Sequence, residues 1–206
     1  AISVEYIMNL IALDREVRVA GMVFNPATYP TANKLTLSGT SQFSDNSSDP
    51  IGVISDALDA CIVRPNTMVI GRPAFSKLAR HPQIVSACLR NPGEAGVARR
   101  QDIAALFELE EVVVGEAFVN TARKGQAANL SRCWGKHLSV IYRNKQAAPT
   151  RDVTFGMTVP WGTPIAGSWP DKNIGLRGGE MVRAGESLCE LITCADAAYF
   201  IQDAVA

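Results

Sequence analysis

The chain has 206 residues, of which 47% are hydrophobic and 19% are charged, and its 20 Lys and Arg residues balance 20 Asp and Glu residues. This composition is typical of a folded globular protein of one or two domains and excludes an intrinsically disordered chain. The zero net charge shows no basic excess of the kind that accompanies nucleic-acid binding.

The first predicted element is a long amphipathic helix over residues 2–23. Apolar residues recur three and four positions apart, as in Val4, Ile7 and Ile11, and form a wide apolar face. Pro26 marks the end of the helix. A helix of about 22 residues is roughly 33 Å long, so it needs more packing partners than a short hairpin supplies.

Residues 25–50 are predicted to be irregular, apart from one short strand over 34–37. Asp49 and Pro50 predict the start of a second helix, because Asp accepts hydrogen bonds from free amides and Pro suits the first helical turn.

Short apolar strands and helices alternate over the next hundred residues. The predicted strands are 67–70, 112–114 and 136–143, and the predicted helices are 72–80, 82–89 and 99–108. Residues 116–133 are predicted to form a loop of small and polar side chains. This alternation favours an α/β or α+β layered domain over residues 50–145.

From residue 153 onward the pattern changes to strands with Gly and Pro kinks. Residues 181–183 and 188–193 are predicted to form a hairpin that turns at Ala184 and Gly185. Residues 195–204 are predicted to form a final short helix or strand.

The sequence contains no catalytic, cofactor or metal motif above background. The odd number of cysteines and the lack of a CxxC pair indicate reduced thiols rather than disulfides or a zinc site. We interpret His81 as a helix-boundary residue that caps a carbonyl and His137 as a surface residue. An enzyme with a Cys or carboxylate site is kept as an alternative, which thiol labelling at Cys61 or Cys133 would test. The cysteines are Cys61, Cys88, Cys133, Cys189 and Cys194.

No membrane or secretion signal is predicted. The chain has no run of about 18 apolar residues and no signal peptide at its start. It begins without Met, which indicates a fragment or a processed product with part of the protein upstream.

Several segments follow one another along the chain in the same order as in a known protein family. They are Asp14 to Val23, residues 48–54, residues 64–84, residues 103–117, Trp134-Gly135, residues 155–161 and residues 178–183. In this order the segments resemble those of tailed-bacteriophage major capsid proteins of the Hong Kong 97-like fold, from about residue 10 to the end. The family's N-terminal arm and extended loop precede its long helix and are not found here, so covalent cross-linking is not carried over.

The resemblance implies an α+β fold in two parts. A peripheral domain would contain the long spine helix (residues 1–49) and the late strands, hairpin and C-terminal segment (150–206). A mixed α/β axial domain would span residues 50–149, with the loop 116–133 at the five- or six-fold axis of a ring.

The function implied is structural rather than enzymatic. Such a subunit assembles with itself into pentamers and hexamers of an icosahedral head that encloses double-stranded DNA without reading its sequence. Its expected partners are further copies of itself and scaffolding, portal and decoration proteins, without a cofactor or a membrane. It would be made in the cytoplasm of the bacterial host and located in the virion. A bacterial nanocompartment (encapsulin-like) shell protein of the same fold is the alternative within this class.

Charged residues on the spine helix and in the loop are candidates for ion pairs between subunits, and ordinary solvated charge is the alternative for each. The candidates are Arg15, Glu16, Arg18, Arg123, Lys124 and Arg132.

Overall fold

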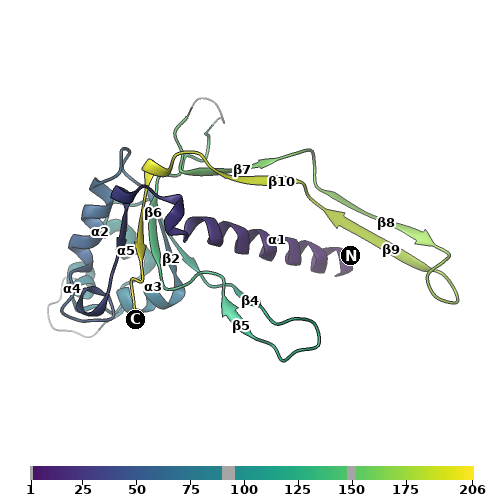
Figure 1. The fold of residues 1–206 in the computed structure, drawn as a ribbon, viewed down its shortest axis with the longest axis horizontal. Helices are drawn as coiled ribbons and strands as arrows, with labels where there is room; N and C mark the ends of the chain where they lie inside the picture. The colour runs from purple at the N-terminus through teal and green to yellow at the C-terminus, as the bar shows by residue number, and fades with distance from the viewer. Residues whose placement is uncertain (1, 90–95, 148–151) are drawn as a thin grey trace.

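The computed structural model describes residues 2–89, 96–147 and 152–206. A body of sheet and helices carries two long projections, a helix and a two-stranded ribbon, which run side by side (Figure 1). The helices are α1 (Ile2–Val23), α2 (Pro50–Asp59), α3 (Arg72–Leu78), α4 (Pro82–Leu89) and α5 (Arg100–Leu106). The strands are β1 (Lys34–Thr36), β2 (Thr67–Gly71), β3 (Glu111–Gly115), β4 (Phe118–Asn120), β5 (Leu130–Arg132), β6 (Leu138–Ile141), β7 (Gly156–Pro160), β8 (Ile165–Asp171), β9 (Gly179–Gly185), β10 (Leu188–Ile192) and β11 (Ala198–Gln202). The mixed α+β class predicted from the sequence is confirmed.

The body is organised by a five-stranded mixed sheet in the order β1-β11-β6-β2-β3. β2 pairs in parallel with β3, and β6 runs antiparallel to both β2 and β11. β2 is buried along its whole length, as its unbroken apolar sequence indicates. The sheet takes strands from all three predicted ranges, 1–49, 50–149 and 150–206. β1 comes from the first range, β2, β3 and β6 come from the second, and β11 comes from the third.

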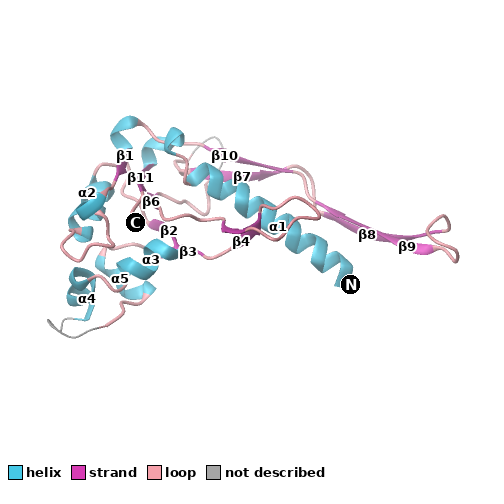
Figure 2. Ribbon diagram, turned by 60° about the horizontal axis from the view of Figure 1, so that its bottom comes forward, coloured by secondary structure: helices cyan, strands magenta, loops and turns pink. Residues whose placement is uncertain are grey.

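Alternate residues of the central strands feed two apolar clusters, because successive side chains of a strand point to opposite faces. Met68 and Ile70 belong to the cluster that contains residues of α2, α3, α4 and α5. Val69 belongs to the second cluster, together with Ala20 and Val23 at the end of α1. Figure 2 shows the four short helices gathered at the end of the molecule away from the ribbon.

The start of α2 confirms the capping prediction. The Asp49 carboxylate accepts a hydrogen bond from the Gly52 amide at 3.0 Å, and Pro50 occupies the first helical position. The cap satisfies one of the amides that a helix start leaves free.

The ribbon corrects one prediction. The hairpin expected between 181–183 and 188–193 is wrong, because β9 pairs with β8 and β10 pairs with β7. The Trp161 amide donates to the Ser187 carbonyl at 2.8 Å and continues the pairing between the two segments. The chain reverses at the far end instead, where Gly175 and Gly178 have positive φ angles of 67° and 77° that suit glycine.

The segment 116–133 is more ordered than the expected loop. β4 and β5 pair antiparallel within it and form a short hairpin, which projects from the body beside α1 (Figure 1). Its connecting residues have the polar and small character that was predicted, and Gly125 has a φ of 86°.

Candidate subunit interface

Ion pairs hold α1 against the ribbon. Arg15 lies 3.6 Å from Glu186, and Arg18 donates to Glu190 at 2.8 Å and also pairs with Asp14. The hydrogen bond from Arg18 lowers the pKa of Glu190. Arg15 and Arg18, predicted for contacts between subunits, therefore have carboxylate partners within their own chain.

Trp134 connects the C-terminal part of α1 to the body of the protein. Its indole Nε1 donates to Glu16 at 2.7 Å, and its ring meets Phe24 edge to face, with centroids 5.2 Å apart. Trp134 is only 8% exposed. It lies over Gly115, where an added Cβ would come within 2.0 Å of the indole. Glu16, another predicted interface residue, thus positions α1 within the chain.

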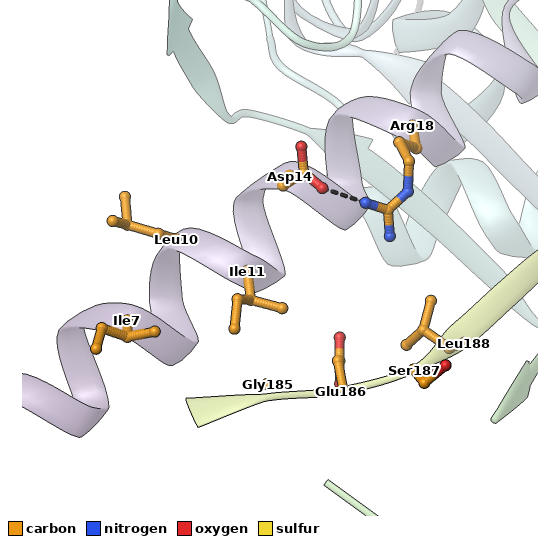
Figure 3. A pocket seen from close by; sticks show the side chains of 9 residues that line it. All are labelled: Ile7, Leu10, Ile11, Asp14, Arg18, Gly185, Glu186, Ser187 and Leu188. Carbon is orange, nitrogen blue, oxygen red and sulfur yellow. Dashed lines mark hydrogen bonds and ion pairs between the residues drawn. The ribbon is translucent and has the colours of Figure 1, made fainter. Parts of the chain in front are cut away.

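A hollow of about 550 Å³ lies between α1 and the junction of β9 and β10. Figure 3 shows Glu186 pointing from the ribbon toward α1, across from Ile11. The Glu186 Oε1 atom is buried and makes no hydrogen bond among the described residues, but the Arg15 guanidinium lies 3.6 Å from it as its ion-pair partner. The hollow is lined by both apolar and polar or charged residues: Ile7, Leu10, Ile11, Asp14, Arg18, Gly185, Glu186, Ser187 and Leu188.

The β4–β5 hairpin carries the remaining predicted interface residues. Arg123 and Lys124 are exposed in its connecting segment. The Arg132 guanidinium lies 4.4 Å from the centre of the Phe118 ring, a cation–π geometry. Phe118 and Leu130 are exposed on the same face of the hairpin. These six predicted residues are therefore spread over two surfaces, and their role between subunits stays a prediction.

The two histidines have structural contacts. The buried His81 ring accepts a hydrogen bond from the Gln83 amide at 3.2 Å, and its other nitrogen lies 3.1 Å from the Asp45 carbonyl, as its interpretation as a capping residue predicted. The interpretation of His137 as a surface residue is wrong. Its ring is half-buried because Phe24, just after α1, and Phe200 of β11 both lie against it.

The five cysteines are free thiols, and three of them are made less nucleophilic by burial. Burial raises the pKa of Cys61 to about 11 and also raises the pKa values of Cys88 and Cys133. Because the thiolate is the reactive form, these side chains are poor nucleophiles at neutral pH. Within the described ranges, no three His, Cys, Asp or Glu side chains are placed to hold a metal ion. None of the described helices has the length and hydrophobicity that crossing a membrane requires.

Sequence reasoning missed the exposed apolar side chains of the ribbon, which include Trp161 and Trp169. The signal was present in the alternation of residues along 157–169. The hairpin expected from the sequence pairs these strands with the wrong partners, so it does not show which side chains share the exposed face.

Comparisons with known proteins point to one class. The chain is 49% identical over 202 residues to the major capsid protein of Pseudomonas phage JBD67, a match that covers 98% of this chain and 65% of the relative. It is 31% identical over 208 residues to the major capsid protein of Burkholderia phage BcepMu, covering 97% of this chain and 64% of the relative. The chain therefore spans slightly less than two thirds of the length of these relatives. The predicted resemblance to phage major capsid proteins is confirmed.

The fold has a solved counterpart. The crystal structure of a phage-related protein from Bordetella bronchiseptica RB50 superposes with a TM-score of 0.84 at 24% sequence identity, and the match covers 99% of this chain and 66% of that protein. No family model matches the chain.

Proposed function

We propose that this chain forms most of a phage major capsid subunit, with a structural role and a Hong Kong 97-like fold. The observation that carries the proposal is the 49% identity, over 98% of the chain, to a phage protein named major capsid protein. The second capsid relative, at 31% identity, supports it.

The shape of the molecule supports a shell-building role. A subunit of a closed shell contacts its neighbours over wide, complementary surfaces. α1, the ribbon and the β4–β5 hairpin all project from the body and present much surface for their mass (Figure 1).

In the proposed subunit, α1 and the ribbon form the peripheral part, and the sheet with its helices forms the axial part. The sequence-based division at residues 49/50 and 149/150 stays a prediction. The shared sheet favours placing residues 34–49 and 194–206 with the axial part, because β1 and β11 pair within it. The β4–β5 hairpin would lie near the ring axis, where the exposed Arg123 and Lys124 would face neighbouring subunits.

The proposed assembly consists of pentamers and hexamers that close an icosahedral head around double-stranded DNA. Its other proposed partners are scaffolding, portal and decoration proteins. The protein would be made in the bacterial host cytoplasm and incorporated into the virion.

Size-exclusion chromatography combined with negative-stain electron microscopy of the purified protein tests the proposal. We expect hollow particles, or rings of five and six copies. A protein that stays monomeric at every salt concentration and pH, with and without scaffolding protein from the same phage, would contradict it.

A further inference from the structure

Arginines gather at the C-terminal end of the parallel strands β2 and β3. Arg72 follows β2 and Arg100 begins α5, and both pair with Glu116, which follows β3, at 3.1 and 2.8 Å. The guanidinium carbons of Arg72 and Arg100 lie 5.7 and 5.8 Å from the centre of the Phe75 ring. One carboxylate therefore serves two arginines over the same ring.

A groove of about 330 Å³ opens beside these arginines. Phe75, Ala79 and Val97 give it apolar walls, and Arg72 and Arg80 line it as well. Val97 is 61% exposed. The groove therefore offers a surface that combines apolar contact with positive charge.

Two more arginines at this end have no ion pair within the described part of the chain. Arg80 donates to the Ser76 carbonyl at 2.8 Å, and Arg99 is exposed at the start of α5. The Arg99 amide, not its guanidinium, donates to Asp102. We call this group the basic end: Arg72, Arg80, Arg99 and Arg100 with Glu116 and Asp102. Four arginines against two carboxylates leave two positive charges in excess.

The N-terminal end of the same two strands carries the opposite charge. Arg64, which precedes β2, pairs with Asp59 at 3.0 Å and with Glu108 at 3.5 Å. Glu110, just before β3, is exposed and has no ion pair among the described residues. We call this group the acidic end: Asp59, Glu108, Glu110 and Glu111 with Arg64 and Arg143, the partner of Glu111. Four carboxylates against two arginines leave two negative charges in excess.

The stability of α5 does not account for this separation of charge. Arg99 and Arg100 lie at its N-terminus, where the helix dipole disfavours positive charge. Glu108 lies just beyond its C-terminus, where the dipole disfavours negative charge. Both placements cost the isolated helix some stability, which favours a role for these charges outside it.

The acidic end also presents an exposed apolar side chain. Ile62 lies between Asp59 and Arg64 in the chain and is 69% exposed. Its amide donates to the Asp196 carbonyl at 3.3 Å, which holds the backbone that displays it. Ile62 is thus an apolar side chain surrounded by carboxylates, as the groove is an apolar surface beside arginines.

We propose that the acidic end of one copy of this chain docks on the basic end of a second copy, with Ile62 in the groove. This proposal deepens the capsid function and rests on it. Opposite charges across an interface select the partner and set its orientation, and the apolar contact lies at the centre of a polar rim, as in other protein interfaces.

One chain cannot make this contact with itself. The two ends lie at opposite ends of β2, whose five residues span roughly 13 Å at about 3.3 Å per residue. The contact is therefore head to tail between copies, which is the geometry that generates rings.

Two substitutions on the two sides of this contact test it. Arg80→Glu reverses a charge at the groove, and Ile62→Lys places an ammonium where the apolar side chain would enter. Both residues are exposed in the single chain, so circular dichroism and thermal unfolding should match those of the unmodified protein. Each variant alone should lose at least about tenfold of its assembled particles, because like charges would meet across the contact and its apolar anchor would be lost.

Lys77→Glu is the matched control, because Lys77 is exposed on α3 but does not line the groove. This variant should assemble normally. A loss equal to that of Arg80→Glu would show that any charge reversal on α3 is enough and would overturn the assignment to the groove.

Mixing the two variants gives the sharpest result. An Arg80→Glu copy keeps an intact acidic end with Ile62, and an Ile62→Lys copy keeps an intact groove. An equimolar mixture should therefore form dimers in analytical ultracentrifugation, although neither variant associates alone. A mixture that associates no more than the single variants would overturn the inference, and so would normal assembly of either variant. If the unmodified protein does not assemble, the proposed function itself fails.

Discussion

Replacing Trp134 by Ala should destabilise the protein strongly, because this side chain joins α1 to the sheet. The indole is 8% exposed and packs edge to face on Phe24. Truncating a buried Trp to Ala costs about 3–5 kcal/mol. The lost hydrogen bond adds little, because Glu16 is only partly buried and gains water as a donor. We expect a loss of about 4 kcal/mol, a large part of the roughly 5–15 kcal/mol that stabilises a typical protein.

Urea unfolding followed by far-UV circular dichroism measures this loss. With a slope of about 2 kcal/mol per molar urea, the midpoint should fall by about 2 M. Trp134→Phe keeps part of the ring contact with Phe24 and loses the hydrogen bond to Glu16 and some buried ring volume, so its cost should be smaller, about 1–2 kcal/mol.

Trp161→Ala is the matched control, because Trp161 is 84% exposed and its truncation should change stability by less than about 0.5 kcal/mol. If Trp134→Ala lowers the midpoint no more than Trp161→Ala does, the reasoning that Trp134 fastens the helix is wrong.

Three further substitutions follow from local geometry. Asp49→Ala removes the cap on the Gly52 amide and should lower the free energy of unfolding by about 1 kcal/mol; Asp49→Asn, which retains an acceptor, should restore most of it in the same urea titration. Gly71→Ala would place a Cβ 1.7 Å from the Gly135 carbonyl oxygen, so it should lower the free energy of unfolding by about 3 kcal/mol. An unchanged thermal midpoint would show that the end of β2 is placed incorrectly. Burial lowers the pKa of His137 in the folded state, outweighing the nearby Asp203 carboxylate, so the unfolded chain takes up the proton first. The contribution of the neutral His137 ring to stability should therefore be fully present above pH about 6.5 and decline as the pH falls through the folded pKa. His137→Gln should flatten this decline. An equal decline in both proteins would rule out His137 as its source.

The local elements of the body were predictable because their signals are local. The three- and four-residue spacing of apolar residues placed α1, and the Asp49-Pro50 pair placed the start of α2. The unbroken apolar run at 67–70 identified the buried β2 strand. Each of these features depends on side chains within a few positions of one another.

The pairing of the ribbon was not predictable, because it joins residues far apart in the chain. Ala184-Gly185 is a plausible turn by composition, but those residues continue β9 toward β10 and the reversal occurs near Gly178. The site depended on the same long-range geometry. Sequence alone could not show that Arg18 reaches Glu190 or that Trp134 reaches Glu16.

His137 shows a third limit. It follows Lys136 and precedes an apolar strand, a pattern typical of a surface position. The structure brings Phe24 from the end of α1 and Phe200 from β11 against its ring. Burial of such a boundary residue depends on elements that are remote in sequence.

Cryo-electron microscopy of the purified protein under assembling conditions tests the capsid role most directly. We predict closed shells built from rings of five and six copies, with density for α1 and the ribbon at the boundaries between subunits. Particles whose density does not accommodate this fold, or a protein that remains monomeric or dimeric at every concentration, would contradict the capsid role.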